Sequence, residues 1–279
     1  IREIFKLLAK PGMISFAGGN PAKSALPDDV CAELAKEVLT DNGKAILQYG
    51  ATEGYAPLLE SLRAYVEDAL GCPVDGILPT TGSTSCMDLM LKAFINPGDA
   101  VLVESPTFLG NMQTLNLYQA KLIPVESDEG GVKLDKLEEA IKEHHPKLFY
   151  IIPSFQNPSG RTLAADRRKP IYELAKKYGF IVMEDDPYRD LRYTGEHLPT
   201  IKSFDTTGHV VYMGSFSKII SPGLRVGFLV AEKDILRKCT IGKQGTDLHT
   251  PNLNQAIVDL FLRRGMLEGH IESIIPAYK

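Results

Sequence analysis

The chain has 279 residues and is 44% hydrophobic, which is enough to build a large folded core. Its formal net charge of -4 argues against nucleic acid or an anionic membrane as a partner, and no apolar run is long enough to span a membrane. The four cysteines have no paired spacing, so neither a disulfide framework nor a metal site is predicted, and a reducing, cytoplasmic location is favoured.

The first part of the chain predicts helices joined by loops. Residues 1–10 form an amphipathic pattern, and residues 30–39 form a second helical pattern. The loop between them contains Gly18 and Gly19, a pair that lets backbone approach a ligand closely, although an ordinary connecting loop fits equally well. Tyr49 lies in the turn-rich segment QYGATEGY, before the amphipathic helix PLLESLRAYVEDAL.

From about residue 76 onward, strand-like and helix-like patterns alternate. Apolar, β-prone runs begin at seven positions, near Ile77, Val101, Leu122, Leu148, Ile181, Val210 and Val226. Alternation of this kind is typical of an α/β protein. The chain is therefore predicted to fold around a mostly parallel, seven-stranded sheet with helices on both faces.

The first of these runs, GILPTTG, leads into Ser83 and Thr84, and the helical segment SCMDLMLKAFI follows directly. Small residues at a helix N-terminus leave free backbone N–H groups and a favourable dipole for an anion. The signal is weak alone, because Ser and Thr are also common helix caps.

A second candidate site is the acidic cluster at the end of the apolar run FIVMEDDPYRDL. Glu184, Asp185 and Asp186 are adjacent, and they repel one another unless a cation or a proton is nearby. A protonated heterocyclic nitrogen is one such partner. A metal ion or a solvated loop are the alternatives, but no further metal ligands stand at a readable spacing.

The most informative stretch is VVYMGSFSKIISPGLRVGFLV, residues 210–230, in which two apolar runs enclose Lys218. A lysine between core strands is costly to desolvate unless it is paired or used covalently, as in a Schiff base. Ser215, Ser217 and Arg225 then become candidate phosphate ligands, because Arg matches phosphate oxygens in a bidentate fork. The alternative for the lysine alone is a solvated loop residue.

Taken together, these motifs resemble those of class I/II aminotransferases, the fold-type I enzymes that use pyridoxal 5'-phosphate (PLP). The likeness rests on SFSK followed by PGLRVG, on NPSG at 157–160 and on EDDPY at 184–188, and it covers nearly the whole chain. It implies an N-terminal arm with part of a small domain at 1–45, a PLP-binding large domain at 46–266, and the start of an interdomain helix at 267–279. It also implies that a C-terminal small domain, with an arginine for the substrate carboxylate, is missing from this sequence.

The resemblance also assigns roles to individual residues. Lys218 is expected to hold PLP as a Schiff base and move the reacting proton, Asp185 to keep the pyridine nitrogen protonated, and Tyr188 and Asn157 to contact the phenolic oxygen. Phe108 occupies the place of an aromatic residue that stacks on the ring, with plain core packing as its alternative. The expected phosphate ligands are Ser83, Thr84, Ser215, Ser217, Arg225 and, from the partner subunit of a homodimer, Tyr49. Gly18, Gly19 and Asn157 are expected at the substrate.

The function implied is transfer of an amino group from an amino acid to a 2-oxo acid. The acidic motif and the Gly-Gly loop resemble most the branch of 2-aminoadipate, kynurenine and aromatic aminotransferases. Two alternatives remain: the effector domain of a PLP-dependent transcription regulator, whose DNA-binding helix-turn-helix is not seen here, and a PLP lyase or decarboxylase.

Overall fold

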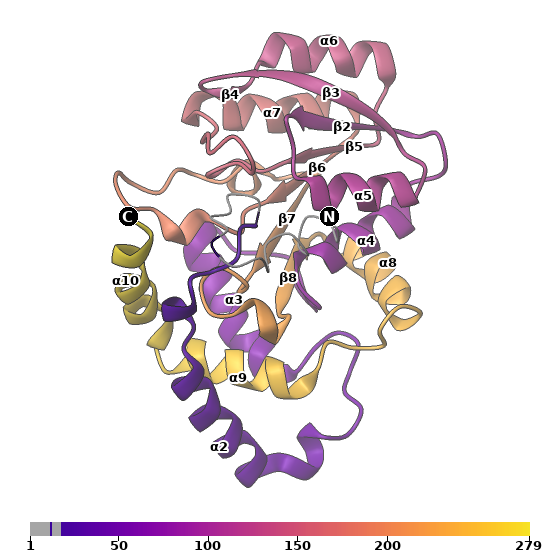
Figure 1. The fold of residues 1–279 in the computed structure, drawn as a ribbon. Helices are drawn as coiled ribbons and strands as arrows, with labels where there is room; N and C mark the ends of the chain where they lie inside the picture. The colour runs from indigo at the N-terminus through magenta and orange to yellow at the C-terminus, as the bar shows by residue number, and fades with distance from the viewer. Residues whose placement is uncertain (1–11, 13–17) are drawn as a thin grey trace.

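The computed structural model describes Gly12 and residues 18–279, and the helix predicted at 1–10 lies outside this part. One sheet forms its centre (Figure 1). Its eight strands are β1 Gly76–Thr80, β2 Ala100–Ser105, β3 Lys121–Asp128, β4 Gly131–Val132, β5 Leu148–Ile151, β6 Ile181–Asp185, β7 Val210–Ser215 and β8 Gly227–Ala231.

Seven of these strands begin within one residue of the predicted positions. The eighth, β4, corrects the predicted count: it has two residues, too few to show an alternating pattern, and it pairs with the end of β3. The strand order is β1-β8-β7-β6-β5-β2-β3-β4. Neighbours are parallel from β7 through β6, β5 and β2 to β3, whereas β8 is antiparallel to both β7 and β1.

Helices cover both faces of the sheet, as predicted (Figure 1). One face packs against α4, α5 and α8, and the other packs against α6 and α7 at one end and against α3 and α9 at the other. The helices of the described part are α2 Asp28–Ile46, α3 Ala56–Leu70, α4 Ser83–Phe94, α5 Leu109–Leu117, α6 Leu134–His144, α7 Ala165–Tyr178, α8 Lys233–Gln244, α9 Asn252–Arg263 and α10 Met266–Tyr278.

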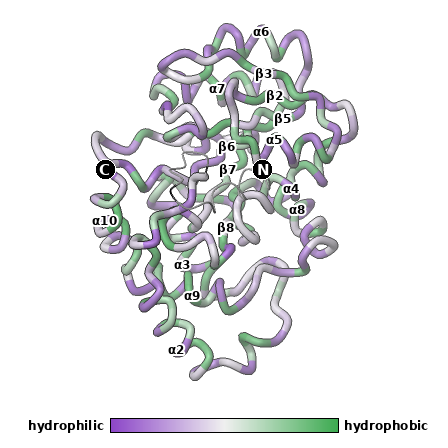
Figure 2. Tube along the Cα trace, in the orientation of Figure 1, coloured by the Kyte–Doolittle hydropathy of each residue, from purple (hydrophilic) through white to green (hydrophobic). Residues whose placement is uncertain are grey.

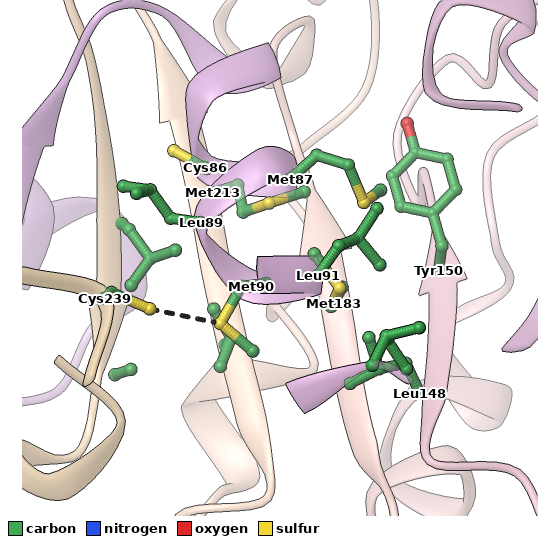
Figure 3. Packing of buried hydrophobic residues seen from close by; sticks show 14 of the residues in the cluster. Cys86, Met87, Leu89, Met90, Leu91, Leu148, Tyr150, Met183, Met213 and Cys239 are labelled. Atoms are coloured by element: carbon green, nitrogen blue, oxygen red, sulfur yellow. Dashed lines mark hydrogen bonds between the residues drawn. The ribbon is translucent and has the colours of Figure 1, made fainter. Parts of the chain in front are cut away.

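The central strands are buried on both faces, which explains their continuous apolar sequence. In β6, Val182 packs toward α7 and Met183 toward α4, because successive side chains point to opposite faces. Figure 2 shows the hydrophobic colour along β2 and β5 and mixed colour along the outer helices α2 and α6. The side chains of α4 and the strands beneath it interleave in Figure 3, where Cys239 Sγ lies 3.6 Å from Met90 Sδ.

Candidate active site

The predicted site residues leave the sheet at one edge. The parallel strands all end there, and β1 joins them because Thr80 pairs with Gly227 at the start of β8. The chain runs outward from β2 to β3 and then in the opposite direction from β5 to β6. Ligands of open α/β sheets bind at such a reversal, beyond the carboxyl ends of the strands. Phe108, after β2, and Asn157, after β5, flank this position.

Asp185, the last residue of β6, is buried at this edge. Its Oδ2 accepts a 2.8 Å hydrogen bond from the phenol of Tyr150 and a 3.5 Å contact from Nδ2 of Asn111. Its Oδ1 is buried without a hydrogen-bond partner among the described residues. Burial raises the pKa of Asp185 to about 7, while the bond from Tyr150 opposes the rise. One carboxylate oxygen is thus available to a protonated ligand atom.

The other two acids of the cluster lie apart from Asp185. Glu184 points to the opposite face of the sheet and accepts the backbone N–H groups of Ile201 and Lys202, at 2.8 and 2.7 Å. Burial raises its pKa to about 7. Asp186 is also buried, and its pKa is raised to about 6 against the opposing charges of Arg168 and Arg189. The three acids therefore have three separate environments.

Asn157 and Tyr188 come together across the edge. Nδ2 of Asn157 donates a 3.1 Å hydrogen bond to the phenolic oxygen of Tyr188. Burial raises the pKa of Tyr188, and the bond from Asn157 lowers it. The turn that carries Asn157 is fixed by Gln156, whose Nε2 donates to the carbonyl of Pro106 at 2.8 Å. Because Pro106 lies two residues before Phe108, this bond ties the loops of β2 and β5 together.

Phe108 is half-buried at the start of α5 and packs against the core beneath α4. Tyr188 packs against the same core cluster. Phe108 therefore lies at the edge of the sheet and also packs against the core. The Phe108 ring lies close to Gly110, where an added Cβ would approach the ring carbons at 2.6 Å.

The N-terminus of α4 forms a tight turn beside Arg225. Gly82 precedes the helix with φ +82°, and a Cβ there would lie 2.2 Å from Nη2 of Arg225. On the β8 side, a Cβ on Gly227 would approach the backbone of Gly82 at 2.8 Å. Ser83 is half-buried and Thr84 is exposed at the first helical positions. The turn thus presents free N–H groups next to a guanidinium.

Ser215, Ser217 and Arg225 form a connected polar group at the end of β7. Oγ of Ser215 donates to Oγ of Ser217 at 2.9 Å, and Nη1 of Arg225 lies 3.5 Å from Oγ of Ser217. Nη2 of Arg225 also donates to the carbonyl of Thr81 at 3.0 Å. The serines, the arginine and the α4 turn are therefore adjacent, although 130 or more residues separate Thr81 from the others in sequence.

Lys218 is half-buried beyond this group, and its Nζ donates to the carbonyl of Gly19 at 2.5 Å. Burial lowers the pKa of Lys218, which favours the uncharged amine that attacks an aldehyde. The contact places the backbone carbonyl of Gly19 beside the lysine amine.

Within one chain, Tyr49 does not lie with the other candidate phosphate ligands. Its side chain is 80% exposed, and its ring meets His249 edge to face with centroids 6.2 Å apart. The neighbouring N–H of Gly50 donates to Nε2 of His249 at 3.1 Å. An exposed tyrosine on a supported turn is available to another molecule, as the predicted role requires.

The comparisons with known proteins agree with this geometry. Residues 11–262 match the family model described as aminotransferase class I and II. The chain belongs to this aminotransferase family. It is 41% identical to an aromatic-amino-acid aminotransferase of Thermococcus litoralis and 42% identical to a 2-aminoadipate transaminase of Thermus thermophilus. In both cases the match covers 100% of this chain, and 69% and 70% of the relative.

A solved structure shares the fold closely. The kynurenine aminotransferase of Pyrococcus horikoshii superimposes with a TM-score of 0.95 at 41% identity, over 99% of this chain and 70% of that one. These relatives show the fold-type I architecture and support an aminotransferase over a transcription regulator or a lyase. The protein is a PLP-dependent aminotransferase.

The residues present fit PLP on three observations. Asp185 has a buried oxygen, Oδ1, that has no hydrogen-bond partner within the described part of the chain and suits a pyridinium N–H. The α4 turn, where no Cβ fits at Gly82, presents N–H groups and Arg225 to an anion. Lys218, with its lowered pKa, is a suitable amine for an aldehyde. A phosphate, a ring nitrogen and an aldehyde are the three features that such a donor set accommodates.

Several residues of the site escaped the sequence analysis. Tyr150 and Asn111 support Asp185, and Thr81 holds Arg225 through its carbonyl. The only indication in the sequence was the polar hydroxyl of Tyr150 within the apolar run LFYII. The contacts of Tyr150, Asn111 and Thr81 cannot be predicted without knowing the strand order.

Residues 18–279 contain no helix with the length and apolar character needed to cross a membrane. The same residues bring together no group of three or more His, Cys, Asp or Glu side chains placed to hold a metal ion.

Proposed function

We propose that this aminotransferase holds PLP through Nζ of Lys218 and transfers amino groups between an amino acid and a 2-oxo acid at the carboxyl edge of its sheet. The carrying observation is the convergence there of three unlike groups. They are the half-buried Lys218, Oδ1 of Asp185, which has no partner among residues 18–279, and the α4 turn bound to Arg225.

The proton chemistry follows from these positions. PLP supplies, when bound, a ring that accepts electrons from the bond being broken at the substrate. Asp185 holds the proton on the pyridine nitrogen through Oδ1, because an ionised carboxylate favours the charged form of its partner. Nζ of Lys218 would hold the cofactor's aldehyde carbon and would serve as the base that moves a proton between the substrate's Cα and C4′.

The remaining residues orient the cofactor. Asn157 and Tyr188, already bonded at 3.1 Å, donate to the phenolic oxygen, and Phe108 stacks on the ring face. With a phenyl group here, no hydroxyl acts from the stacking position. The phosphate is held by the N–H groups and side chains of six residues, Ser83, Thr84, Ser215, Ser217, Arg225 and Tyr49 of the partner subunit.

For the substrate, we propose an amino acid with a large acidic or aromatic side chain. The support is the set of relatives, whose names refer to aromatic amino acids, 2-aminoadipate and kynurenine. Gly18, Gly19 and Asn157 lie on the substrate side, since the Gly19 carbonyl contacts Lys218 directly. A loop of two glycines keeps side chains away from the place where a large substrate enters.

The assembly and location are proposed on separate grounds. A homodimer with shared sites accounts for the exposed Tyr49. The predicted domain boundaries at residues 45 and 266 place the whole cofactor-binding sheet within one domain. A cytoplasmic location accords with four cysteines that are scattered in sequence and all carry free thiols.

Borohydride reduction of the PLP-loaded enzyme followed by peptide mapping tests the assignment of Lys218. We expect the pyridoxyl label on Lys218 alone, and a label on Lys202 or Lys243 would refute it. Product analysis with glutamate, 2-aminoadipate and phenylalanine then tests the reaction. A 2-oxo acid that retains its carboxyl group is expected, whereas release of carbon dioxide would indicate a decarboxylase.

A further inference from the structure

A charged cluster lies behind the α4 turn, outside the proposed cofactor contacts. Nζ of Lys243, on α8, donates to both carboxylate oxygens of Asp247, at 2.8 and 2.9 Å. Oδ2 of Asp247 also accepts a 2.6 Å hydrogen bond from the hydroxyl of Thr81. Thr81 stands directly before Gly82 and the first helical residue, Ser83. The three side chains thus form a chain of contacts that ends on the turn.

The cluster contains a fully buried lysine side chain, which is unusual for a charged residue. The Lys243 side chain is fully buried, and that of Asp247 is 26% exposed. A buried ion pair is weak evidence for stability, because the cost of desolvating two charges offsets their attraction. The pair does, however, hold the carboxylate in one orientation, since both oxygens contact the ammonium group. Asp247 is therefore a fixed acceptor for Thr81.

Thr81 is held from two sides. Its hydroxyl donates to Asp247, and its carbonyl accepts from Nη2 of Arg225 at 3.0 Å. A rotation of this residue would move the backbone N–H group of Ser83 and, at the same time, the carbonyl that anchors the guanidinium. Both groups of the proposed phosphate site therefore depend on the orientation of one threonine.

We propose that Lys243, Asp247 and Thr81 are positioning residues that set the affinity of the α4 turn for a phosphate monoester dianion. They do not touch the anion. They fix the direction of the N–H groups and of Arg225, so that little reorganisation is needed when the anion binds. This inference rests on the proposed placement of the PLP phosphate at the turn.

The test compares two ligands of the cofactor-free enzyme, PLP and pyridoxal, which differ only in the phosphate. Two variants disrupt the cluster: Thr81→Val and Asp247→Asn. Thr81→Val keeps the side-chain shape and removes one hydrogen bond, so we expect about a 3- to 10-fold rise in the Kd for PLP and an unchanged Kd for pyridoxal. Asp247→Asn in the Thr81→Val background should add little, because the coupled contact is already lost.

A matched control is available on the same loop. Thr246→Val removes the hydroxyl that contacts Lys92 on the exposed side of α4, and it should leave the Kd of both ligands unchanged. If Thr81→Val weakens PLP and pyridoxal equally, or weakens neither, the cluster has only a packing role and the inference is wrong.

The Arg225→Gln variant distinguishes an error in the positioning role from an error in the proposed phosphate site. If Arg225→Gln also leaves the ratio of the two dissociation constants at the wild-type value, the phosphate does not bind at the turn, and the proposed site itself is wrong. If that ratio changes for Arg225→Gln but not for Thr81→Val, only the positioning role is refuted. Inorganic phosphate is then titrated as a competitor of PLP. Its affinity should fall in Thr81→Val and stay at the wild-type value in Thr246→Val.

Discussion

The phenol of Tyr150 donates a 2.8 Å hydrogen bond to Oδ2 of Asp185, and the other oxygen of that carboxylate, Oδ1, is buried without a partner among the described residues. The two oxygens therefore have different roles. One is held by the protein, and the other is the atom that we propose for the cofactor's ring nitrogen. Tyr150 orients the carboxylate and favours its ionised form.

Asp185→Asn should retain PLP but lose most of its transaminase activity. An amide cannot hold a proton on the pyridine nitrogen by charge, so the ring becomes a poorer electron acceptor. PLP absorbance and turnover of 2-aminoadipate measure the two effects separately. Near-normal turnover would refute the assignment of Asp185 as the partner of the ring nitrogen.

Tyr150→Phe should shift the pH dependence of kcat. Removal of the donor to Asp185 raises the pKa of its carboxyl, so a higher pH is needed to ionise it. We expect the acid limb of the profile to move up by about 1 pH unit, which corresponds to one charge-assisted hydrogen bond. The change is measured over pH 5 to 9 at saturating substrate. An unshifted acid limb with lowered kcat would show that Tyr150 contributes packing alone.

Gly82→Ala should abolish tight PLP binding. The added Cβ would meet Arg225 at 2.2 Å, and the backbone angle of +82° is itself unfavourable for alanine. Gly98→Ala is the matched control, with φ +88° and no atom within 4 Å of the added Cβ. The control should lose a similar amount of stability without weakening PLP binding. Equal PLP affinity in the two variants would contradict the tight packing of the turn on Arg225.

Glu104→Gln should flatten the pH dependence of stability. Glu104 accepts the N–H of Ile152 at 2.8 Å, and burial raises its pKa to about 8. The folded protein therefore keeps this proton at pH values where the unfolded chain, with an ordinary pKa of about 4.3, has released it. The resulting loss of stability reaches about 1.4 kcal/mol per pH unit between these two pKa values, and it occurs as pH rises.

Urea unfolding of the cofactor-free protein at pH 5 to 9 measures this effect. Glutamine keeps an acceptor for Ile152 without a titrating proton, so its unfolding free energy should fall less steeply with pH. Glu129→Gln is the control, because the Glu129 side chain is 91% exposed. If the two variants have the same slope, Glu104 does not carry the buried proton.

Mixed dimers test the shared site. Tyr49→Ala weakens the neighbouring subunit's phosphate site, and Lys218→Ala removes the lysine of its own site. A heterodimer of the two variants contains one site with both wild-type residues. Equal mixing should therefore restore roughly a quarter of wild-type activity from two nearly inactive proteins. Absence of restored activity, with heterodimers confirmed by mass spectrometry, would place Tyr49 outside the partner's site.

The sequence predicted those candidate site residues that lie in short motifs next to apolar strands. Lys218 with Arg225, Asn157 in its turn and Asp185 after β6 all belong to this class, and seven strands were located by the same apolar runs. The two-residue β4 was missed because its pattern is too short.

Other features depend on which strands are neighbours. Tyr150 reaches Asp185 because β5 and β6 pair, and Asp247 reaches Thr81 across 166 positions of the chain. The separation of Glu184 from Asp185 follows from the alternation of side chains in β6, once it is known that both faces are covered. Predicting such contacts requires knowledge of the strand order, which local sequence patterns do not specify.

The antiparallel pairing of β7 with β8 has a consequence for how the enzyme can move. Lys218 and Arg225 both lie in the connection between these two strands, so the proposed covalent and ionic contacts to the cofactor belong to a single hairpin. A hairpin closes through local backbone pairing and does not pass through a crossover helix. The spacing between the aldehyde end and the phosphate end of the proposed cofactor site is therefore set by the local pairing of β7 with β8, and it does not depend on a distant part of the chain.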